Sequence, residues 1–409
     1  MTHDLIIIGA GAAGLFAAAN VPPDWNTLVL EKTASPGQKL LLTGSGQCNL
    51  TNDKAVQNFL THYGKNGKSL RQILFPFSNL ALMAYFERHG LPLETRPDGK
   101  VFPTSSKSQD VLNLLLREAK TRGVTIRYHT PVTDLRPQSG TDGSLFVLTS
   151  PAGQFSAKNV LVTTGGASYP QTGSDGTFFA CLERLGIPLV PLRPALTPLF
   201  VQNYPYGALS GISFPSAAVS ISPRAGGRPF RVEGDLLLTH RGFSGPAILA
   251  SSRYVTQGDK LEIHYLPTET PDALRRTLLD TATGDARQIV TLLESVTSLP
   301  HRFLEHICRR AGLETHAKAS RLTGQDMTAL SALLTADTYE ISGTGGFSTA
   351  MATAGGVALD EIHLQSLESK KHPGLYFAGE VLDVDGDTGG YNLQFAFSSA
   401  KRSIEAMHL

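Results

Sequence analysis

The chain has 409 residues, enough for two or three domains of ordinary size. Hydrophobic residues make up 41% and charged residues 17%, which excludes a wholly disordered chain because there is ample apolar surface to bury. Lys and Arg total 36 against 35 Asp and Glu, a formal net charge of +1. No global field therefore attracts nucleic acid or acidic membranes, although a local basic groove is compatible with this balance. We expect a globular protein with no nucleic-acid or membrane partner.

The cysteines and the N-terminal segment indicate the cellular compartment of the protein. Three cysteines, Cys48, Cys181 and Cys308, are too few for a disulfide framework and indicate reduced thiols. No Cys/His cluster predicts a metal site. The apolar stretch 5–19 lacks the cationic start of a signal peptide and contains three glycines, and no run reaches the ~18 residues that span a bilayer. We therefore expect a cytoplasmic protein.

The chain opens with a βαβ pattern. The all-apolar run 5–8 predicts a strand buried on both faces, a small-residue helix follows at 15–20, and 27–30 predicts a second strand. Such a crossover is right-handed. The spacing further predicts, in chain order, a helix at 79–89, a loop at 90–105 and a helix at 106–122.

Short alternating runs at 124–160 are typical of antiparallel strands. A buried strand at 160–164 and a helix at 175–185 follow, and three prolines within 191–198 mark a boundary. Beyond it the pattern predicts a β-rich stretch at 199–265 with a helix starting at Ser244, helices over 271–336, strand and glycine signals at 339–358, a buried strand at 375–378 and a helix at 391–408.

Gly9, Gly11 and Gly14 form a G-x-G-x-x-G sequence between the first strand and the first helix. Gly9 permits a tight turn, Gly11 lets the backbone approach a pyrophosphate, and Gly14 allows close helix–strand packing. Glu31 ends the second strand, 20 residues after Gly11, where it can accept hydrogen bonds from an adenosine ribose. The alternative is an ordinary glycine-rich turn, but strand, helix and acid together predict dinucleotide binding.

The identity of the dinucleotide follows from Glu31 and from later elements. A glutamate at this position repels a 2′-phosphate, which leaves NAD and FAD. A strand with glycines at 160–166 and the run 375–380 favour FAD, because Glu380 follows a buried strand where ribitol hydroxyls need an acceptor. No second complete fingerprint is present, so NAD(P)H stays open as a transient electron donor in the same cleft, beside oxygen or another protein.

Eight segments carry a family resemblance, and they span nearly the whole chain except 265–335. They are 4–14, 31–32, 37–52, 101–103, 164–170, 239–246, 379–386 and 389–394. The chain resembles the aminoacetone-oxidase/BaiN-like family of FAD-binding flavoproteins. Its most specific elements are Gly-x-Cys-Asn-x-Thr-Asn at 46–52 and Gly-Gly-Tyr-Asn-Leu-Gln at 389–394. Gln47, where the family usually has Arg, and Arg241, where an aromatic is common, depart from the pattern.

The resemblance implies an α/β fold. It comprises a Rossmann-type FAD-binding domain like that of glutathione reductase, an inserted β-rich, barrel-like domain and a small helical subdomain. Shifts in composition place a discontinuous FAD-binding domain at 1–190 and 345–409, the β-rich domain at 191–268 and 337–344, and the helical subdomain at 269–336.

The resemblance also implies the cofactor contacts. They run from the pyrophosphate loop through the ribitol to the last helix, whose N-terminal dipole would stabilise negative charge on the reduced flavin. The residues are Gly9, Gly11, Ala13, Gly14, Glu31, Lys32, Gln38, Lys39, Leu40, Gly46, Cys48, Asn49, Val132, Thr164, Gly165, Gly379, Glu380, Asn392, Leu393 and Gln394.

Two side chains are candidates for catalysis, and each has a structural alternative. Cys48 has no Cys-x-x-x-x-Cys partner, so we expect a single thiol packed near the cofactor. His240 is either a substrate-side acid or base or a structural hydrogen-bonding histidine. Other singled-out residues have ordinary interpretations: Asp383, Asp385 and Asp387 as a solvated or ribitol-contacting turn, and His301 and His306 as surface residues.

The predicted function is an FAD-dependent oxidoreductase that acts on a small organic substrate by hydride transfer at flavin N5. The resemblance implies amine oxidation or reduction of an activated C=C bond, and no motif chooses between them. A flavin-dependent tRNA-modifying enzyme, which needs a basic, aromatic-lined surface, and a non-enzymatic flavin redox sensor stay open as alternatives. The basic strip Arg224 to Arg231 is expected to be a hairpin turn. The oligomeric state stays open.

Overall fold

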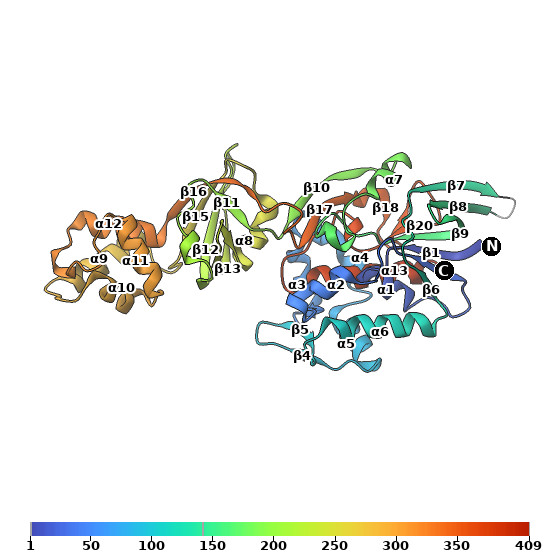
Figure 1. Ribbon diagram of the computed structural model, residues 1–409, viewed down its shortest axis with the longest axis horizontal. Coiled ribbons are helices and arrows are strands. Elements are labelled where there is room, and N and C mark those ends of the chain that lie inside the picture. The colour runs from blue at the N-terminus through green and yellow to red at the C-terminus, as the bar shows by residue number, and fades with distance from the viewer. Residues whose placement is uncertain (1, 141–142, 409) are drawn as a thin grey trace. The chain divides into compact units, whose positions relative to one another are not determined.

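The computed structural model describes residues 2–140 and 143–408. The chain forms two compact units: unit 1 comprises Met1–Ala195 and Phe347–Leu409, and unit 2 comprises Leu196–Gly346. Unit 1 therefore combines both ends of the sequence, the blue and red parts of the ribbon in Figure 1, and unit 2 is a single continuous segment.

A sheet with the strand order β18-β19-β20-β9-β1-β2-β6 forms the centre of unit 1. Residues 5–8 are buried, as expected of a strand covered on both faces. Ile8 pairs with both Leu30 and Val162, which aligns the carboxyl ends of three strands. The parallel strands are β1 (Thr2–Ile8), β2 (Thr27–Leu30), β6 (Thr125–Arg127), β9 (Gly153–Val162) and β20 (Leu375–Phe377).

Four further strands of this sheet pair antiparallel, two of them off the main strand order. β7 (Asp134–Gly140) and β8 (Gly143–Ser150) pair with each other, and β8 also pairs with β9. At one edge of the sheet β18 (Ile362–His363) and β19 (Glu368–Ser369) extend it from β20. The prediction of antiparallel strands throughout 124–160 is wrong for β6, which joins the parallel side beside β2.

Helices pack an aromatic core against the sheet. Phe16 of the first helix contacts Phe397 of the last, with ring centroids 4.9 Å apart, and Tyr85 at 4.8 Å. The predicted helix at 175–185 is shorter, because only Phe179–Arg184 is α-helical. The helices of unit 1 are α1 (Ala12–Ala18), α2 (Gln38–Leu42), α3 (Val56–Phe59), α4 (Arg71–Leu74), α5 (Asn79–Arg88), α6 (Ser108–Thr121), α7 (Phe179–Arg184) and α13 (Tyr391–Ala406).

Two smaller sheets complete unit 1. The predicted loop at 90–105 contains β4 (Leu93–Thr95) and β5 (Lys100–Pro103), which pair in a three-stranded sheet with β3 (Thr51–Asn52). Long-range pairing with β3 cannot be detected in a short local pattern, which explains the error. β10 (Leu189–Ala195) and β17 (Ala352–Val357) form an antiparallel ribbon where the chain leaves unit 1 and returns to it.

Unit 2 contains a closed barrel. The helix predicted near Ser244 is α8 (Pro246–Ser251), but its N-cap is Gly245 and not Ser244, which pairs with Leu237 in the barrel. The strip from Arg224 to Arg231 joins two antiparallel strands, β12 and β13. In barrel order the strands are β11 (Leu199–Val201), β14 (Phe243–Ser244), β13 (Phe230–Leu238), β12 (Ser213–Ser222), β15 (Lys260–His264) and β16 (Asp337–Thr344).

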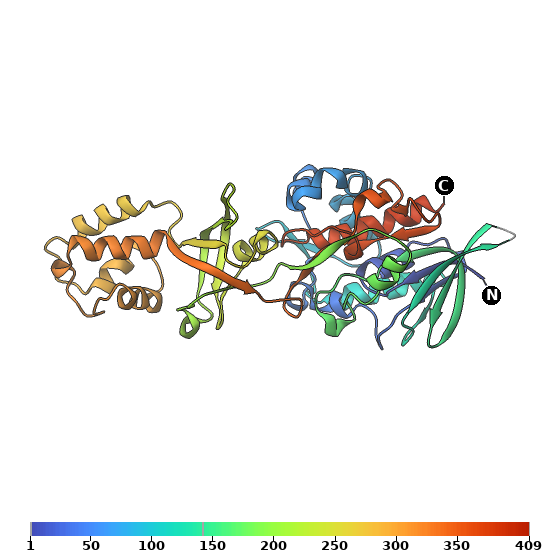
Figure 2. The same cartoon turned by 90° about the horizontal axis from the view of Figure 1, so that it is seen from above.

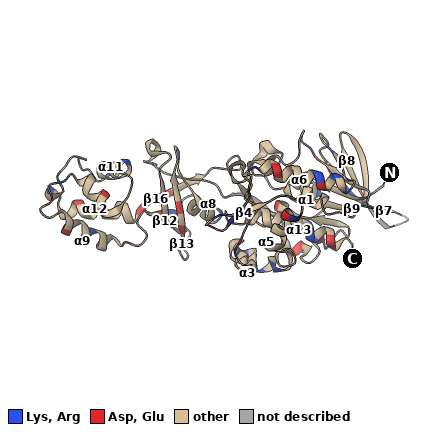
Figure 3. Ribbon diagram, turned by 90° about the horizontal axis from the view of Figure 1, so that it is seen from below, with Lys and Arg blue, Asp and Glu red and all other residues tan. Residues whose placement is uncertain are grey.

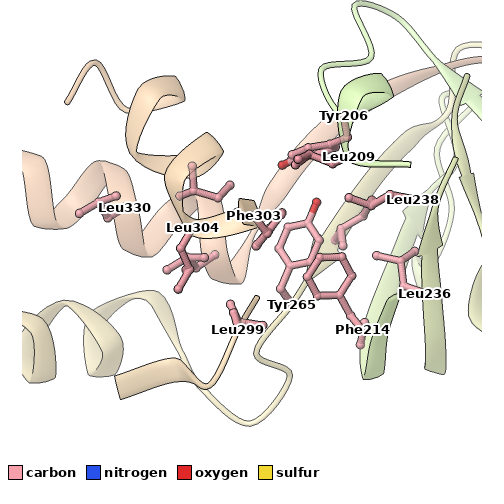
Figure 4. Close-up of a cluster of buried hydrophobic side chains, with 14 of the residues drawn as sticks. Tyr206, Leu209, Phe214, Leu236, Leu238, Tyr265, Leu299, Phe303, Leu304 and Leu330 are labelled. Carbon is pink, nitrogen blue, oxygen red and sulfur yellow. The ribbon is translucent and has the colours of Figure 1, made fainter. Parts of the chain in front are cut away.

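Four helices share a hydrophobic core with this barrel, and α12 leads directly into β16 (Figure 2). Figure 4 shows Phe303 of α11 beside Tyr265 and Phe214 of the barrel, with ring centroids 4.6 and 4.7 Å from that of Phe303. Barrel and helices therefore stabilise each other. The helices are α9 (Pro271–Ala282), α10 (Ile289–Thr297), α11 (His301–Arg310) and α12 (Gly324–Thr335).

Candidate cofactor-binding site

A cavity in unit 1 lies at the carboxyl ends of β1, β2, β9 and β20. Its lining residues surround ≈ 1450 Å³ of space, part of which is open to solvent. Its walls come from the loops that follow these strands, among them 9–13, 31–33, 163–166 and 378–380. Open α/β sheets bind ligands at this edge.

The three fingerprint glycines have different physical roles. Gly9 has φ +102°, and a Cβ there would lie 2.8 Å from the carbonyl oxygen of Thr163. A Cβ on Gly14 would lie 1.9 Å from the carbonyl oxygen of Gly9, so both positions require glycine for packing. Gly11 lines the cavity, and a Cβ there would meet nothing within 4 Å. The backbone at Gly11 is thus open to a phosphate group, as the cofactor requires.

Glu31 is fixed at the end of β2 by neutral donors. Glu31 lines the cavity, and only 8% of the residue is exposed. The Ala10 N–H donates to Oε2 at 2.7 Å, and the Thr33 N–H and hydroxyl donate to Oε1 at 2.8 and 2.7 Å. Because a carboxylate has about four acceptor sites, this arrangement leaves capacity for ribose hydroxyls.

Glu380 is held in a different way, by a cation. Lys39 Nζ lies 2.5 Å from Glu380 Oε2 and also donates to the Ser168 hydroxyl. Oε1 of Glu380 accepts from the Ser168 hydroxyl at 2.9 Å and from the Thr353 N–H at 2.7 Å. The expected ribitol acceptor therefore already has three protein donors, and Lys39 brings a positive charge to the same wall of the cavity.

A second ion pair lies near Glu31. Lys32 Nζ is 2.6 Å from Asp175 Oδ1, and both residues line the cavity. Desolvation of Asp175 is outweighed by its hydrogen bonds to Lys32 and Thr177, which lower the pKa of this carboxyl. Asp175 belongs to no motif, so sequence reasoning missed it. Met351, which is 48% exposed and also lines the cavity, carried no signal either.

Most of the predicted cofactor residues come together along this cavity. The predicted residues that line it are Gly9, Gly11, Ala13, Glu31, Lys32, Gln38, Lys39, Leu40, Val132, Thr164, Gly165, Gly379, Glu380, Asn392 and Leu393. Those that do not are Gly14, Gly46, Cys48, Asn49 and Gln394.

Two of the predicted residues that do not line the cavity hold its walls in place. Gln394 is buried, accepts from the Thr51 hydroxyl at 2.6 Å and donates to the Phe77 carbonyl at 3.2 Å. Asn49, with its amide oriented to satisfy both neighbours, donates to the Thr51 carbonyl and accepts from the Gly390 N–H. Both side chains thus tie the 46–52 segment to the start of α13 and leave the cavity to Asn392 and Leu393.

The two catalytic candidates, Cys48 and His240, lie in different units. Cys48 is fully buried in the core of unit 1, and burial raises the pKa of its thiol to about 12, so the reactive thiolate is absent near neutral pH. His240 is exposed in the turn 239–242 of unit 2, whereas the cavity is lined by unit 1. The placement of Cys48 therefore indicates a structural thiol, and the role of His240 stays a prediction.

Two further predictions are corrected. Asp383 is buried and not solvated: it accepts from the Gly355 N–H at 3.1 Å and from the Asn66 amide. His306 is half-buried against Tyr206, with ring centroids 5.2 Å apart, and burial lowers its pKa. The helical spacing of 301–310 did not reveal that this face packs on the barrel.

Among the residues that the structure describes, no group of three or more His, Cys, Asp or Glu side chains could hold a metal ion. Over the same residues no helix is both long enough and apolar enough to cross a bilayer.

Comparison with known proteins identifies the family. Residues 3–405 match the HI0933-like protein Rossmann domain, which is nearly the whole chain. The chain belongs to the HI0933-like family. The cavity at the fingerprint, with its open Gly11 backbone and fixed Glu31, fits FAD, and this HI0933-like protein is an FAD-dependent oxidoreductase with a Rossmann FAD-binding domain, as the sequence predicted.

Three relatives align over almost their full length. The chain is 32% identical over 403 residues to the ribosomal RNA dihydrouridine synthase of Escherichia coli (strain K12), covering 97% of this chain and 96% of that protein. It is 31% identical to the protein of that name from Haemophilus influenzae, with 97% and 96% covered. It is 29% identical to the 3-dehydro-bile acid delta(4,6)-reductase of Clostridium scindens, with 96% of each chain covered.

Proposed function

We propose that this protein uses FAD to reduce an electron-poor C=C bond conjugated to a carbonyl. The names of the three relatives have this step in common, because dihydrouridine is uridine with one ring C=C bond reduced and a delta(4,6)-reductase acts on conjugated C=C bonds. Of the two reactions that the sequence left open, reduction is therefore favoured over amine oxidation. The observation that carries the proposal is the full-length match to relatives with this one shared chemistry.

The chain's own residues supply binding and charge. The cofactor, once reduced by an external donor such as NAD(P)H, would supply a hydride to one carbon of the C=C bond and return to FAD, while the other carbon takes a proton. Asn392 and Leu393 bring the first turn of α13 to the cavity, where free N–H groups and the helix dipole stabilise negative charge. Lys39 adds a cation on the wall formed with Glu380. Electron-rich states of the cofactor are thereby favoured, which suits a reductase supplied by an external donor such as NAD(P)H.

The substrate is either a small organic molecule, as expected from the sequence, here with a C=C bond conjugated to a carbonyl, or a uracil base within RNA. The second candidate is favoured by two of the three relatives' names. The sequence analysis left open an enzyme that modifies tRNA, whereas these names point to ribosomal RNA. The flavin would reduce a C=C bond in the same way in a small conjugated substrate and in a uracil base.

A half-reaction experiment tests the proposal. The purified holoprotein is reduced anaerobically, and the return of the oxidised flavin band is followed after mixing with a 4-en-3-one steroid, with uridine-containing RNA, or with a matched alcohol that lacks the conjugated carbonyl. We expect reoxidation by a conjugated substrate and none by the alcohol. Reduction of the oxidised flavin by amines, without reoxidation by any conjugated substrate, would contradict the proposal.

A further inference from the structure

Residues 54–86 contain no Asp or Glu, although the chain has 35 such residues. The same stretch carries four cations, Lys54, Lys65, Lys68 and Arg71, within its first 18 residues. The remaining chain has 32 Lys and Arg against 35 Asp and Glu. A net charge of +1 therefore conceals a basic segment, defined here as residues 54–71, on an otherwise slightly acidic protein.

The four cations of the basic segment are all exposed. Lys65 lies 3.6 Å from Asp383 with 77% of its side chain exposed, and the Arg71 guanidinium lies 4.8 Å from the centre of the Phe75 ring. Within residues 2–140 and 143–408, neither Lys54 nor Lys68 forms an ion pair with an acidic side chain. Positive charge is thus available to a partner.

The backbone of the basic segment is fixed by packing. It forms α3, α4 and two 3-10 helices, Leu60–His62 and Gly64–Leu70. Phe59 and Tyr63 are buried beneath it. A Cβ on Gly67 would lie 1.7 Å from the Leu60 carbonyl oxygen, so the turns are closely packed. The cations are held on an ordered surface and lose less conformational freedom on binding than those of a loose tail.

This surface adjoins the cofactor cavity. His62 Nδ1 lies 2.9 Å from Asp387 Oδ2, and the His62 ring stacks on Tyr391 with centroids 4.0 Å apart. The Tyr63 hydroxyl donates to the Tyr391 carbonyl at 2.9 Å. Tyr391 directly precedes Asn392, which lines the cavity. Figure 3 shows Lys and Arg, in blue, beside α3 on this side of unit 1.

We infer that the basic segment binds the phosphate backbone of single-stranded RNA next to the cavity, an inference that rests on the second substrate of the proposed function. Lys and Arg that neutralise phosphates supply affinity without reading sequence. An enzyme that acts on a base must take it out of the stack, which favours a single strand over a duplex. His62 and Tyr63 of the segment contact Tyr391, which is followed by the cavity-lining Asn392, so the segment lies close to the cavity that such a base would enter.

The test is a salt series with matched charge variants of the full-length holoprotein. Binding of a fluorescein-labelled oligouridylate is measured by anisotropy for the wild type, for Lys54→Gln with Lys68→Gln, and for the control Arg224→Gln with Arg228→Gln in unit 2. We expect the first pair of substitutions to lower the slope of log K against log salt by about 1.4, at ~0.7 for each phosphate contact. The control should leave the slope unchanged, and both variants should retain FAD.

Two results would overturn the inference: no binding of the oligouridylate at low salt, or a slope that changes equally or only in the control. Reoxidation of the reduced flavin by the 4-en-3-one steroid, measured on the same preparations, separates this failure from failure of the proposed function. If the wild type does not bind the oligouridylate yet still reduces the steroid, the RNA surface alone is rejected. Salt-dependent RNA binding through Lys54 and Lys68 without reduction of any conjugated substrate keeps the surface and rejects the proposed chemistry.

Discussion

Glu31 and Glu380 both line the cavity, yet different donors fix them. Within residues 2–140 and 143–408, the side chain of Glu31 accepts from neutral groups of Ala10 and Thr33 and forms no ion pair, so no cation offsets the carboxylate at the cavity. Glu380 is paired with Lys39, which offsets its charge. A negative charge at Glu31 accepts ribose hydroxyls and repels a 2′-phosphate. The charge at Glu380 is balanced, which suits a wall that faces the middle of an anionic cofactor.

Replacing Glu31 by Arg removes the acceptor for Ala10 and Thr33 as well as for the ribose. We expect the free energy of FAD binding to weaken by about 1–3 kcal/mol, the scale for leaving buried polar groups without partners. The measurement is a fluorescence titration of the stripped protein with FAD. Glu31→Gln is the control, because it keeps the size and one acceptor oxygen and should lose less. Equal affinity in wild type and Glu31→Arg would place this residue outside the cofactor contact.

In unit 2 a buried carboxylate joins the barrel to the helices. Asp337 at the start of β16 accepts from Arg310 at the end of α11, with Nη1–Oδ2 at 2.9 Å and Nη2–Oδ1 at 3.1 Å. The hydroxyls of Tyr206 and Tyr339 also donate to it, each at 2.5 Å. Burial raises the pKa of both phenols, so they stay protonated donors. Asp337 thereby links β16 to α11 and to Tyr206, which are far apart in the sequence.

Breaking this network should destabilise unit 2. We expect Asp337→Asn to lower its free energy of unfolding by about 3–5 kcal/mol, the scale for removing one partner of a buried ion pair. Tyr339→Phe, which removes one neutral donor, should cost about 1 kcal/mol. Urea unfolding followed by far-UV circular dichroism and tyrosine fluorescence measures both, whereas the fluorescence of the single tryptophan, Trp25, and the FAD absorbance report on unit 1. Unchanged stability in Asp337→Asn would contradict the assigned role of the carboxylate.

At the scale of the whole molecule, the cavity depends on two chain segments that are far apart in sequence. All of its lining residues belong to unit 1, although 351–396 return to it only after the insertion. The ribbon of β10 and β17 pairs Ala195 with Ala352, which places the exit and return of the chain side by side. Unit 1 therefore has a closed core without the continuous segment 196–346.

This arrangement predicts that FAD binding survives removal of unit 2. A variant in which a short Gly/Ser linker replaces residues 196–346 should fold, stay monodisperse and bind FAD with an affinity within about tenfold of the full chain, since none of the lining residues is lost. Absorbance of the bound flavin and thermal melting measure this. The same deletion with Glu31→Arg should lose the cofactor. A soluble, folded but colourless variant would show that unit 2 contributes to the cofactor site.

The sequence by itself determined the βαβ opening, the glycine loop and Glu31. Their signals are local: an apolar run, glycines at fixed offsets and an acid at the strand end fix both the elements and the cavity between them. The sequence also predicted a long insertion within the Rossmann domain, because the composition of 191–344 differs from that of the flanking segments.

Only the tertiary structure decided where side chains with equal sequence signals point. Asn392 and Gln394 share one motif, yet Asn392 lines the cavity and Gln394 turns into the core to meet Thr51. Lys39 and Glu380 are 341 residues apart, and no local pattern encodes their pairing. The physical reason is the same in each case: periodicity sets which element forms, whereas packing between distant segments sets the rotamer, the burial and the charge partner of each residue.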